Sequence, residues 1–246
     1  MGNAVVHFNI SGPEPYELER FYTSLFGWAL DDTGMDYALV DTQAGHGING
    51  GIGPSGDAPA GVTIYVAVDD LVATMGTAVG LGASVVLEPF ELPGVVSLAM
   101  FVDPWGHPIG LVGPRPDGSK APEPSPGEGL GVSWFEIMGP DTDAQAAFYR
   151  DLFGWEIERF PGAPIDYREV HTNAGGINGG MGTPPAGPAY QTVYVSSPDV
   201  GATLARAEEL GAKTLMGPET MPGGPEVAMF QDPHGNVFGL FRANPG

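Results

Sequence analysis

The sequence predicts an α+β fold of four βαβββ modules, paired by tandem duplication into two curved mixed-sheet (half-barrel) domains. Three observations carry this prediction. The stretch Phe21–Trp28 recurs as Phe148–Trp155 with all but two residues identical. Strand and helix patterns follow one another in the order strand, helix, three strands, and this order occurs four times. A Pro-rich segment separates the two copies.

The duplication extends over whole domains. Gly47–Gly51 recurs as Gly176–Gly180, and Met100–Gly106 returns as Met229–Gly235 in closely related form. Self-similarity at nearly constant spacing indicates a repeated folding unit. We therefore predict domains at 1–113 and 130–246, joined by a Pro/Gly-rich linker at 114–129.

The helices are placed by their apolar spacing. Leu18, Phe21, Tyr22 and Leu25 follow the i, i+3, i+4, i+7 pattern of a helix packed on a sheet. The sequence predicts helices at about 15–26, 70–80, 142–153 and 199–210. Gly27 and Gly154 stand where the first and third end, since glycine accepts the left-handed conformation that follows a helix, and Asp141 precedes the third as an N-cap.

The strands are placed by apolar residues that alternate or cluster between turn residues. In the first copy they are expected near 5–10, 28–31, 37–42, 47–52, 62–68, 84–91, 95–102 and 107–112. Phe8, Ile10, Ile64, Val66 and Val68 share the parity expected to pack beneath the helices.

Composition excludes some classes of function. The formal net charge of −21, from 30 acidic and 9 basic side chains, repels phosphate backbones, so we expect no nucleic-acid partner. No apolar run is long enough to cross a bilayer and no secretory signal opens the chain, so no membrane partner is expected either. The absence of cysteine excludes disulfides and thiolate sites, which fits a cytoplasmic protein.

The module order, the helix that ends in Phe-Tyr-x-x-Leu-Phe-Gly-Trp and the Asp-Pro-x-Gly turn before each last strand resemble the vicinal oxygen chelate superfamily. This group includes glyoxalase I, bleomycin-resistance proteins and extradiol dioxygenases, and the likeness covers nearly the whole chain outside the linker. It implies the fold strongly, but the fold hosts many functions.

The resemblance also implies where metal ligands stand in metal-dependent members: on the first strand of each module and as a carboxylate on the last. Here the three matching positions of the first copy hold His7, Thr63 and Gly110; those of the second copy hold Trp134, Thr192 and Gly239. A metal needs three or four converging donors, so no metal ligand is assigned and no cofactor is expected. A divalent metal stays the alternative, with Asn49 as the polar residue at an ambiguous fourth position.

Strand parity indicates which side chains line the concave face of each sheet, where a curved sheet forms a pocket for a small ligand. Such a face is otherwise an ordinary solvent-facing surface. The predicted ligand-binding residues are His7, Asn9, Asn49, Thr63, Tyr65, Trp134, Glu136, Asn178, Thr192 and Tyr194. Of these, Asn49 and Asn178 lie in the Gly-Ile-Asn-Gly-Gly repeat, for which a bulged strand or turn is the favoured interpretation.

No catalytic residue is assigned. Glu136 is the best candidate, because burial beside Trp134 would raise its pKa and suit it to proton transfer, and His7 is the next. If Glu136 is half-exposed, it is merely acidic. His46, His107, His171 and His234 have no partner at ligand spacing and are interpreted as surface residues, while Trp28 and Trp155 should cover the seam between helix and sheet.

The leading hypothesis is a metal-independent small-molecule-binding protein of the sequestration or resistance type, with Trp134 stacking on a flat ligand. The rival is an enzyme, a glyoxalase-like lyase or isomerase, or a hydroxylase or dioxygenase, that uses the same pocket. A protein-interaction module is a third class with less support. All four modules lie in one chain, so a monomer would suffice, and a homodimer stays open.

Overall fold

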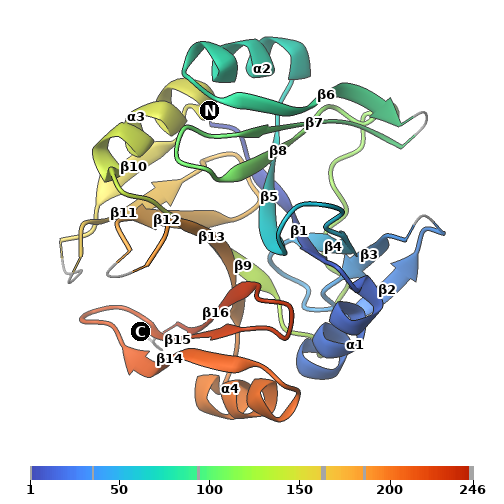
Figure 1. The fold of residues 1–246 in the computed structure, drawn as a ribbon, viewed down its shortest axis with the longest axis vertical. Helices are drawn as coiled ribbons and strands as arrows, with labels where there is room; N and C mark the ends of the chain where they lie inside the picture. Colours follow the sequence, from blue (N-terminus) through green and yellow to red (C-terminus); the bar gives the residue numbers. More distant parts are fainter. Residues whose placement is uncertain (1, 35, 93–94, 162–164, 185–186, 244–246) are drawn as a thin grey trace. The chain divides into compact units, whose positions relative to one another are not determined.

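A computed structural model describes residues 2–34, 36–92, 95–161, 165–184 and 187–243, and its elements follow the predicted order (Figure 1). The first copy contains β1 (Val5–Gly12), α1 (Pro15–Phe26), β2 (Ala29–Asp32), β3 (Ala38–Asp41), β4 (Asn49–Pro54), β5 (Gly61–Ala67), α2 (Leu71–Gly80), β6 (Ser84–Leu92), β7 (Val96–Val102) and β8 (Pro108–Val112). The second contains β9 (Val132–Met138), α3 (Thr142–Phe153), β10 (Glu156–Arg159), β11 (Tyr167–His171), β12 (Asn178–Gly182), β13 (Tyr190–Ser196), α4 (Val200–Glu209), β14 (Lys213–Thr220), β15 (Glu226–Gln231) and β16 (Val237–Arg242).

The strands form two mixed eight-stranded sheets with the same order. One runs β2-β3-β4-β1-β5-β8-β7-β6, and the other runs β10-β11-β12-β9-β13-β16-β15-β14. The pairs β5–β8 and β13–β16 are parallel, whereas the hairpins β6–β7–β8 and β14–β15–β16 are antiparallel. The sequence prediction of an α+β fold from repeated βαβββ modules is confirmed.

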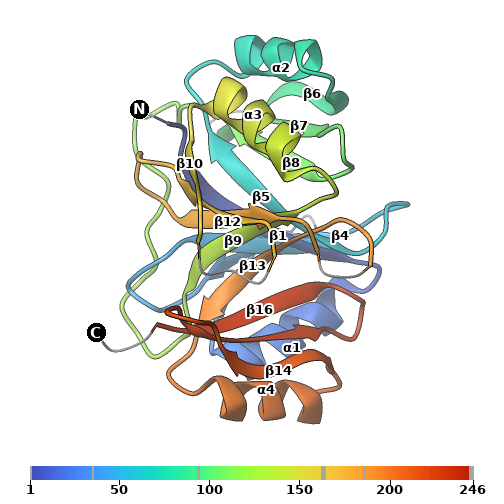
Figure 2. The same cartoon turned by 90° about the vertical axis from the view of Figure 1, so that its left-hand side faces the viewer.

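The chain folds into two compact units, and each draws on both copies of the repeat. The first comprises residues 1–7, 63–122 and 135–191, and therefore holds α2 and α3. The second comprises residues 8–62, 123–134 and 192–246, and holds α1 and α4. In the first unit α2 and α3 lie side by side, as both views show (Figures 1 and 2). The boundaries predicted from the repeat, 1–113 and 130–246, remain a prediction.

Local sequence sets the helix ends. Asp141, Asp70 and Asp199 each cap a helix by accepting a hydrogen bond from the backbone N–H three residues later, which satisfies one of the unpaired donors of the first turn. Gly27 and Gly154 follow α1 and α3 with φ of 71° and 65°, the left-handed conformation expected of them.

Each unit is centred on a cluster of aromatic rings. In the second unit Tyr22 stacks on Trp28 at 5.5 Å and meets Phe238 at 4.9 Å. In the first unit Tyr149 stacks on Trp155 at 5.4 Å, and Phe135 packs against the same indole. The residues predicted to lie beneath the helices (Phe8, Ile10, Ile64, Val66 and Val68) are all buried. Trp28 and Trp155 are buried at these seams, as predicted.

Buried hydrogen bonds join the two copies within each unit. Tyr149 Oη donates to Asp103 Oδ2 at 2.9 Å in the first unit, and Tyr22 Oη donates to Asp232 Oδ2 at 2.8 Å in the second. Burial, and then the neighbouring carboxylate, raises the pKa of both phenols well above its ordinary value, so both remain donors.

The indoles make a matching pair of bonds, from Trp155 to the carbonyl of Asn3 and from Trp28 to that of Leu130. In each unit, these tyrosine and tryptophan hydrogen bonds therefore connect a helix and the residue that follows it in one copy to turns and strand ends of the other copy.

The predicted linker has no regular secondary structure, but its last part is held in place. Gly45 donates its backbone N–H to the carbonyl of Ser125, and Gly129 donates to the carbonyl of Gln43. Among the helices that the structure describes, none combines the length and apolar character that a bilayer-crossing segment requires.

Replacing Tyr149 with Phe tests the importance of these bonds. The change removes one donor to the buried Asp103 carboxylate, so the free energy of unfolding should fall by about 1–3 kcal/mol. Urea unfolding followed by circular dichroism measures this loss. Tyr16→Phe is the matched control, since Tyr16 is 58% exposed, and its unfolding midpoint should equal that of the parent. Equal midpoints for both variants would contradict the structural importance of the Tyr149 bond.

Candidate functional site

In the first unit the candidate residues of β1 and β5 gather around an aromatic pair. The His7 ring meets Tyr65 edge-on, with ring centroids 5.4 Å apart and planes at 83°. Thr63 lies on the same strand as Tyr65 and is buried. Burial lowers the pKa of His7 from 6.5 to about 4 and raises the pKa of Tyr65 to about 12. At neutral pH this group therefore presents an uncharged imidazole and an uncharged phenol.

A glycine lies directly under the Tyr65 ring. Tyr65 is the partner of Gly110 in the parallel β5–β8 ladder. A Cβ atom added to Gly110 would lie less than 3.0 Å from the Tyr65 ring, so only glycine allows the ring to approach this closely. The second unit repeats the arrangement with Tyr194 and Gly239.

The other glycine pair of the repeat serves the same purpose. Gly50 makes room for Phe8 and Gly51 for Tyr37, and the corresponding glycines of the second copy lie against Phe135 and Tyr167. Positive φ is confined to the first residue of the Gly-Ile-Asn-Gly-Gly motif, with 80° at Gly47. The Gly-Ile-Asn-Gly-Gly motif therefore needs its last two glycines mainly because aromatic rings pack against them. The turn conformation that the sequence predicted accounts only for its first glycine.

Glu136 lies on β9 in the first unit and is only 6% exposed. Tyr190 Oη donates a hydrogen bond to Glu136 Oε2 at 3.2 Å. Burial, and then the nearby carboxylate, raises the pKa of Tyr190 well above its ordinary value, which keeps this phenol a donor. The half-exposed alternative for Glu136 is wrong, because β9 is enclosed on both faces from Phe135 onward.

In the second unit the candidates are Asn9, Trp134, Thr192 and Tyr194. Tyr194 is 7% exposed, and Thr192 is fully buried with its hydroxyl donating to the carbonyl of Val237. Trp134 is half-buried as a residue, unlike the buried Trp28 and Trp155. The Oδ1 atom of Asn9 is buried and accepts no hydrogen bond from the described part of the chain.

Asn49 and Asn178 close a loop in the same way in both copies. The side-chain oxygen of Asn49 accepts from the backbone N–H of Thr42 at 3.0 Å, and that of Asn178 accepts from Thr172 at 3.1 Å. These contacts support the structural interpretation of the two asparagines. Their role in binding a ligand remains a prediction.

The two compact units divide the candidates differently from the sequence repeat. His7, Thr63, Tyr65 and Glu136 belong to the first unit, whereas Asn9, Asn49, Trp134, Thr192 and Tyr194 belong to the second. Asn178 lies in the first. That Trp134 and Glu136 line one pocket therefore stays a prediction.

A buried cluster that sequence reasoning missed surrounds His107, which is 2% exposed rather than a surface residue. Its Nδ1 lies 2.8 Å from Asp103 Oδ2 and its Nε2 lies 3.0 Å from the carbonyl of Met138. The signal was present in the Asp-Pro-x-Gly-His spacing, since an aspartate that closes this turn can reach the residue four positions on. In the second copy Asn236 takes the place of His107 and donates to Asp232.

His234 also departs from the surface interpretation, since its side chain is 6% exposed and its Nε2 lies 3.2 Å from Glu17. His46 is exposed, as predicted, and His171 is intermediate.

The residues present do not fit a resident metal. No three His, Asp or Glu side chains of the described ranges converge as a candidate metal site. At the position where a last-strand carboxylate would stand, each copy has a glycine covered by a tyrosine ring. A glutamate at Gly110 would collide with Tyr65 before its carboxylate could reach a metal.

Two family models match the chain. The Glyoxalase-like domain matches residues 7–112, and the Glyoxalase/Bleomycin resistance protein/Dioxygenase superfamily matches residues 131–240. Among curated relatives, "Putative glyoxylase CFP32" of Mycobacterium bovis is 28% identical over 239 residues, covering 92% of this chain and 90% of its own. The "Anthracycline biosynthesis protein DnrV" of Streptomyces peucetius is 27% identical over 272 residues, covering 97% of this chain and 93% of its own.

Among solved structures, the Mn(II)-bound glyoxalase from Novosphingobium aromaticivorans superposes with a TM-score of 0.70 at 16% identity. The match covers 98% of this chain and 81% of that one. At this identity the likeness establishes the shared fold.

The lowered pKa of His7 predicts a pH dependence of stability. Below pH 6.5 the unfolded chain binds a proton on this imidazole, whereas the folded chain resists protonation until about pH 4. Stability should therefore fall as the pH drops from 6.5 to 4, by on the order of 2–3 kcal/mol.

Urea unfolding across this range should show a shallower slope for His7→Gln than for the parent, with His46→Gln as the exposed control. An NMR titration that places the pKa of His7 near 6.5 would contradict the burial argument.

The close packing of Tyr65 on Gly110 predicts strong coupling between the two residues. Gly110→Ala should destabilise the fold by about 1–3 kcal/mol, because the added methyl group meets the ring. In a Tyr65→Ala background the same change should cost much less, and a double-mutant cycle measured by thermal unfolding gives the coupling energy. Equal costs in both backgrounds would show that the ring does not occupy this space.

Proposed function

Because this chain belongs to the glyoxalase/bleomycin resistance/dioxygenase superfamily, we propose that it is a metal-independent small-molecule-binding protein of the sequestration or resistance type. The observation that carries the proposal is the tyrosine–glycine packing in both units. At Gly110 and Gly239, where the resemblance implies a carboxylate in metal-dependent members, the chain presents a tyrosine ring. Such a surface suits contact with an organic ligand and offers a metal nothing to bind.

The polar groups around this surface favour an uncharged or weakly polar ligand. In the first unit His7 is neutral, Tyr65 keeps its proton and Thr63 adds a hydroxyl. In the second unit the buried Oδ1 of Asn9 would accept a hydrogen bond from a ligand. Apolar walls with a few polar groups are typical of small-ligand sites.

Trp134 indicates the shape of the ligand. It is the one tryptophan among the candidates and is half-buried, so a flat aromatic molecule could stack on its indole. The name of the relative DnrV refers to anthracycline biosynthesis, and anthracyclines are flat polycyclic aromatic molecules. Polycyclic aromatic metabolites are therefore the first ligand class to test.

Binding should be visible in tryptophan fluorescence and independent of metal. Chelator-stripped protein should give a saturable change with a polycyclic aromatic ligand, and Trp134→Phe should remove most of it. Trp105→Phe is the control, since Trp105 packs against Phe148 in the first unit. If the Trp134→Phe variant kept the saturable fluorescence change, the ligand would bind at another site.

A calorimetric titration of the stripped protein with Zn²⁺, Ni²⁺, Co²⁺, Fe²⁺ and Mn²⁺ tests the absence of a metal. We expect no stoichiometric tight site. A tight site that is lost in His7→Ala would overturn the proposal and favour a metal-dependent lyase or dioxygenase.

One observation favours a second candidate function, an enzyme of the lyase, isomerase or hydroxylase type. Glu136 is buried with a tyrosine donor at its carboxylate, and such a group can accept a proton from a substrate and return it.

Glu136→Gln separates the two functions. The amide keeps the shape and the hydrogen-bond acceptor but cannot accept a proton, so a sequestering protein should keep its ligand affinity within a few-fold. Turnover of a glyoxalase-type substrate by the parent, lost in Glu136→Gln without loss of binding, would establish the enzyme instead.

A further inference from the structure

Exposed apolar side chains are concentrated on one part of the first unit. Seven of the ten large hydrophobic side chains exposed in the described chain lie between residues 72 and 95. They are Val72, Val79, Val85, Val86, Leu87, Phe90 and Val95, and their exposed fractions run from 39% to 69%. Scattered exposed hydrophobics are normal, whereas a contiguous patch indicates an interaction surface.

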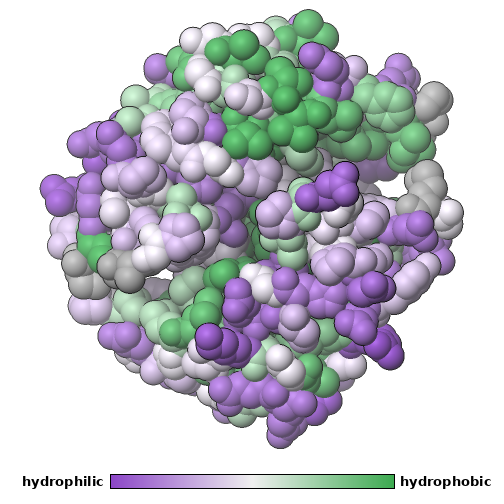
Figure 3. All heavy atoms as spheres, in the orientation of Figure 1, coloured by the Kyte–Doolittle hydropathy of each residue, from purple (hydrophilic) through white to green (hydrophobic). Residues whose placement is uncertain are grey.

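All of these residues except Val95, which directly precedes β7, belong to two packed elements, α2 and β6. We call the surface of these two elements the α2–β6 face. Val72 and Val79 lie two turns apart on α2, on a stripe separate from the buried Leu71 and Met75. Beside the helix, β6 is the last strand of its sheet, and no other strand of the described residues pairs with its outer edge. Figure 3 shows hydrophobic residues gathered over α2 and the β6–β7 hairpin.

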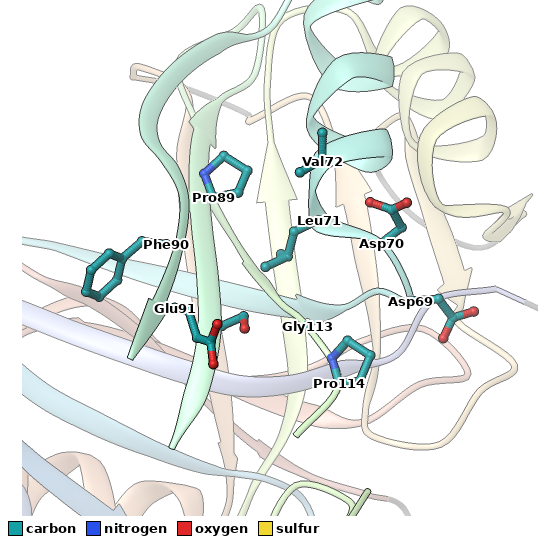
Figure 4. A pocket seen from close by; sticks show the side chains of 10 residues that line it. Asp69, Asp70, Leu71, Val72, Pro89, Phe90, Glu91, Gly113 and Pro114 are labelled. Atoms are coloured by element: carbon teal, nitrogen blue, oxygen red, sulfur yellow. The ribbon is translucent and has the colours of Figure 1, made fainter. Parts of the chain in front are cut away.

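The same face contains a hollow. It has a volume of about 290 Å³, is open to solvent and lies between the start of α2 and the end of β6 (Figure 4). Leu71, Val72 and Phe90 line it together with Pro89 and Pro114, and acidic residues stand at its rim. The α2–β6 face therefore has exposed apolar side chains and also a hollow whose lining includes apolar side chains.

The second copy of the repeat provides an internal comparison. At three of the matching positions α4 and β14 carry Glu208 for Val79, Glu219 for Phe90 and Thr214 for Val85, whereas Val86 and Leu87 are matched by the apolar Leu215 and Met216. Thr214 donates a hydrogen bond to Glu208, and Arg206 pairs with Glu209. The fold therefore accepts charged or polar side chains at these three positions, so apolar residues at Val79, Val85 and Phe90 are not required to build the module.

Charge indicates what covers the α2–β6 face. The chain has a formal net charge of −21, yet residues 71–87 contain no charged side chain. Two copies of so acidic a protein repel one another over most of their surface. They can approach closely where neither presents a carboxylate, and the first half of this face is such a place. A basic partner, in contrast, would be drawn to the acidic surfaces elsewhere.

From this combination we infer that the α2–β6 face binds a second copy of this chain and forms an isologous homodimer. In such a dimer the same patch is buried on both subunits, and an exposed side chain of each can enter the hollow of the other. The contact removes the exposed valine, leucine and phenylalanine side chains from water, which supplies the driving force.

The test is the molar mass of the full chain in solution, measured by sedimentation equilibrium over a range of micromolar concentrations. The parent should sediment at twice the 25.6 kDa of one chain. The variant Val79→Glu/Phe90→Glu copies the residues of α4 and β14 and should sediment as a monomer, with an unchanged circular dichroism spectrum.

The matched control is Leu215→Glu/Thr220→Glu, which adds the same charge to exposed positions of β14 and should remain dimeric. A parent that is monomeric at every concentration would leave this face to another protein and overturn the inference. A dimer that persists in Val79→Glu/Phe90→Glu would overturn it as well.

Salt provides an independent measurement. Screening weakens repulsion between two acidic chains, so added NaCl should tighten the dimer. Weakening by salt would instead indicate an interface held by opposite charges and would contradict an apolar contact. Because the chain has no cysteine, Val86→Cys carrying a nitroxide label reports the distance between subunits directly. Labels beyond the range of pulsed dipolar spectroscopy in a confirmed dimer would place the interface elsewhere.

Discussion

The structure depends on a buried hydrogen bond that occurs once in each compact unit. Tyr149 reaches Asp103 in the first and Tyr22 reaches Asp232 in the second, so a helix of one copy is held on a turn of the other. The carboxylate in each case also holds the turn itself, through the backbone N–H groups that follow it. Stacked tryptophan, tyrosine and phenylalanine rings surround both bonds. A buried carboxylate is tolerated only because several donors meet it at once, and this requirement fixes how each unit is assembled.

A second constraint, the packing of tyrosine on glycine, shapes the candidate site. Tyr65 packs on Gly110 and Tyr194 packs on Gly239, at the positions where the resemblance to metal-dependent members implies a carboxylate. Both copies therefore present an aromatic surface at this position. The neutral state of His7 follows from the same enclosure, because a ring surrounded by protein loses the hydration that its charged form needs. These features together support binding of an organic molecule without a metal.

The two copies also differ in a way that concerns their surfaces rather than their cores. The core positions of α2 and α4 are alike, with Leu71, Met75 and Ala78 matched by Val200, Leu204 and Ala207. Their outer positions diverge in the second half of each helix, where Thr77, Val79 and Gly80 are matched by the charged Arg206, Glu208 and Glu209. Packing restricts core residues in both copies, whereas an outer position is free to change unless something binds there. The proposed association through the α2–β6 face rests on this contrast.

The sequence alone determined the repeated βαβββ order, the helix bounds, the Asp141 cap and the parity of Phe8 and Ile10, because these follow from the spacing of neighbouring residues. It also led us to expect no metal site, which stays a prediction. It failed at His107, whose burial depends on Met138 of the other copy, and it did not show that each compact unit combines modules from both copies. It also did not show why both copies need Gly110 and Gly239. Contacts between residues far apart in the chain leave no periodic signal, so only the tertiary structure decided which rings cover those glycines and which carboxylates are buried.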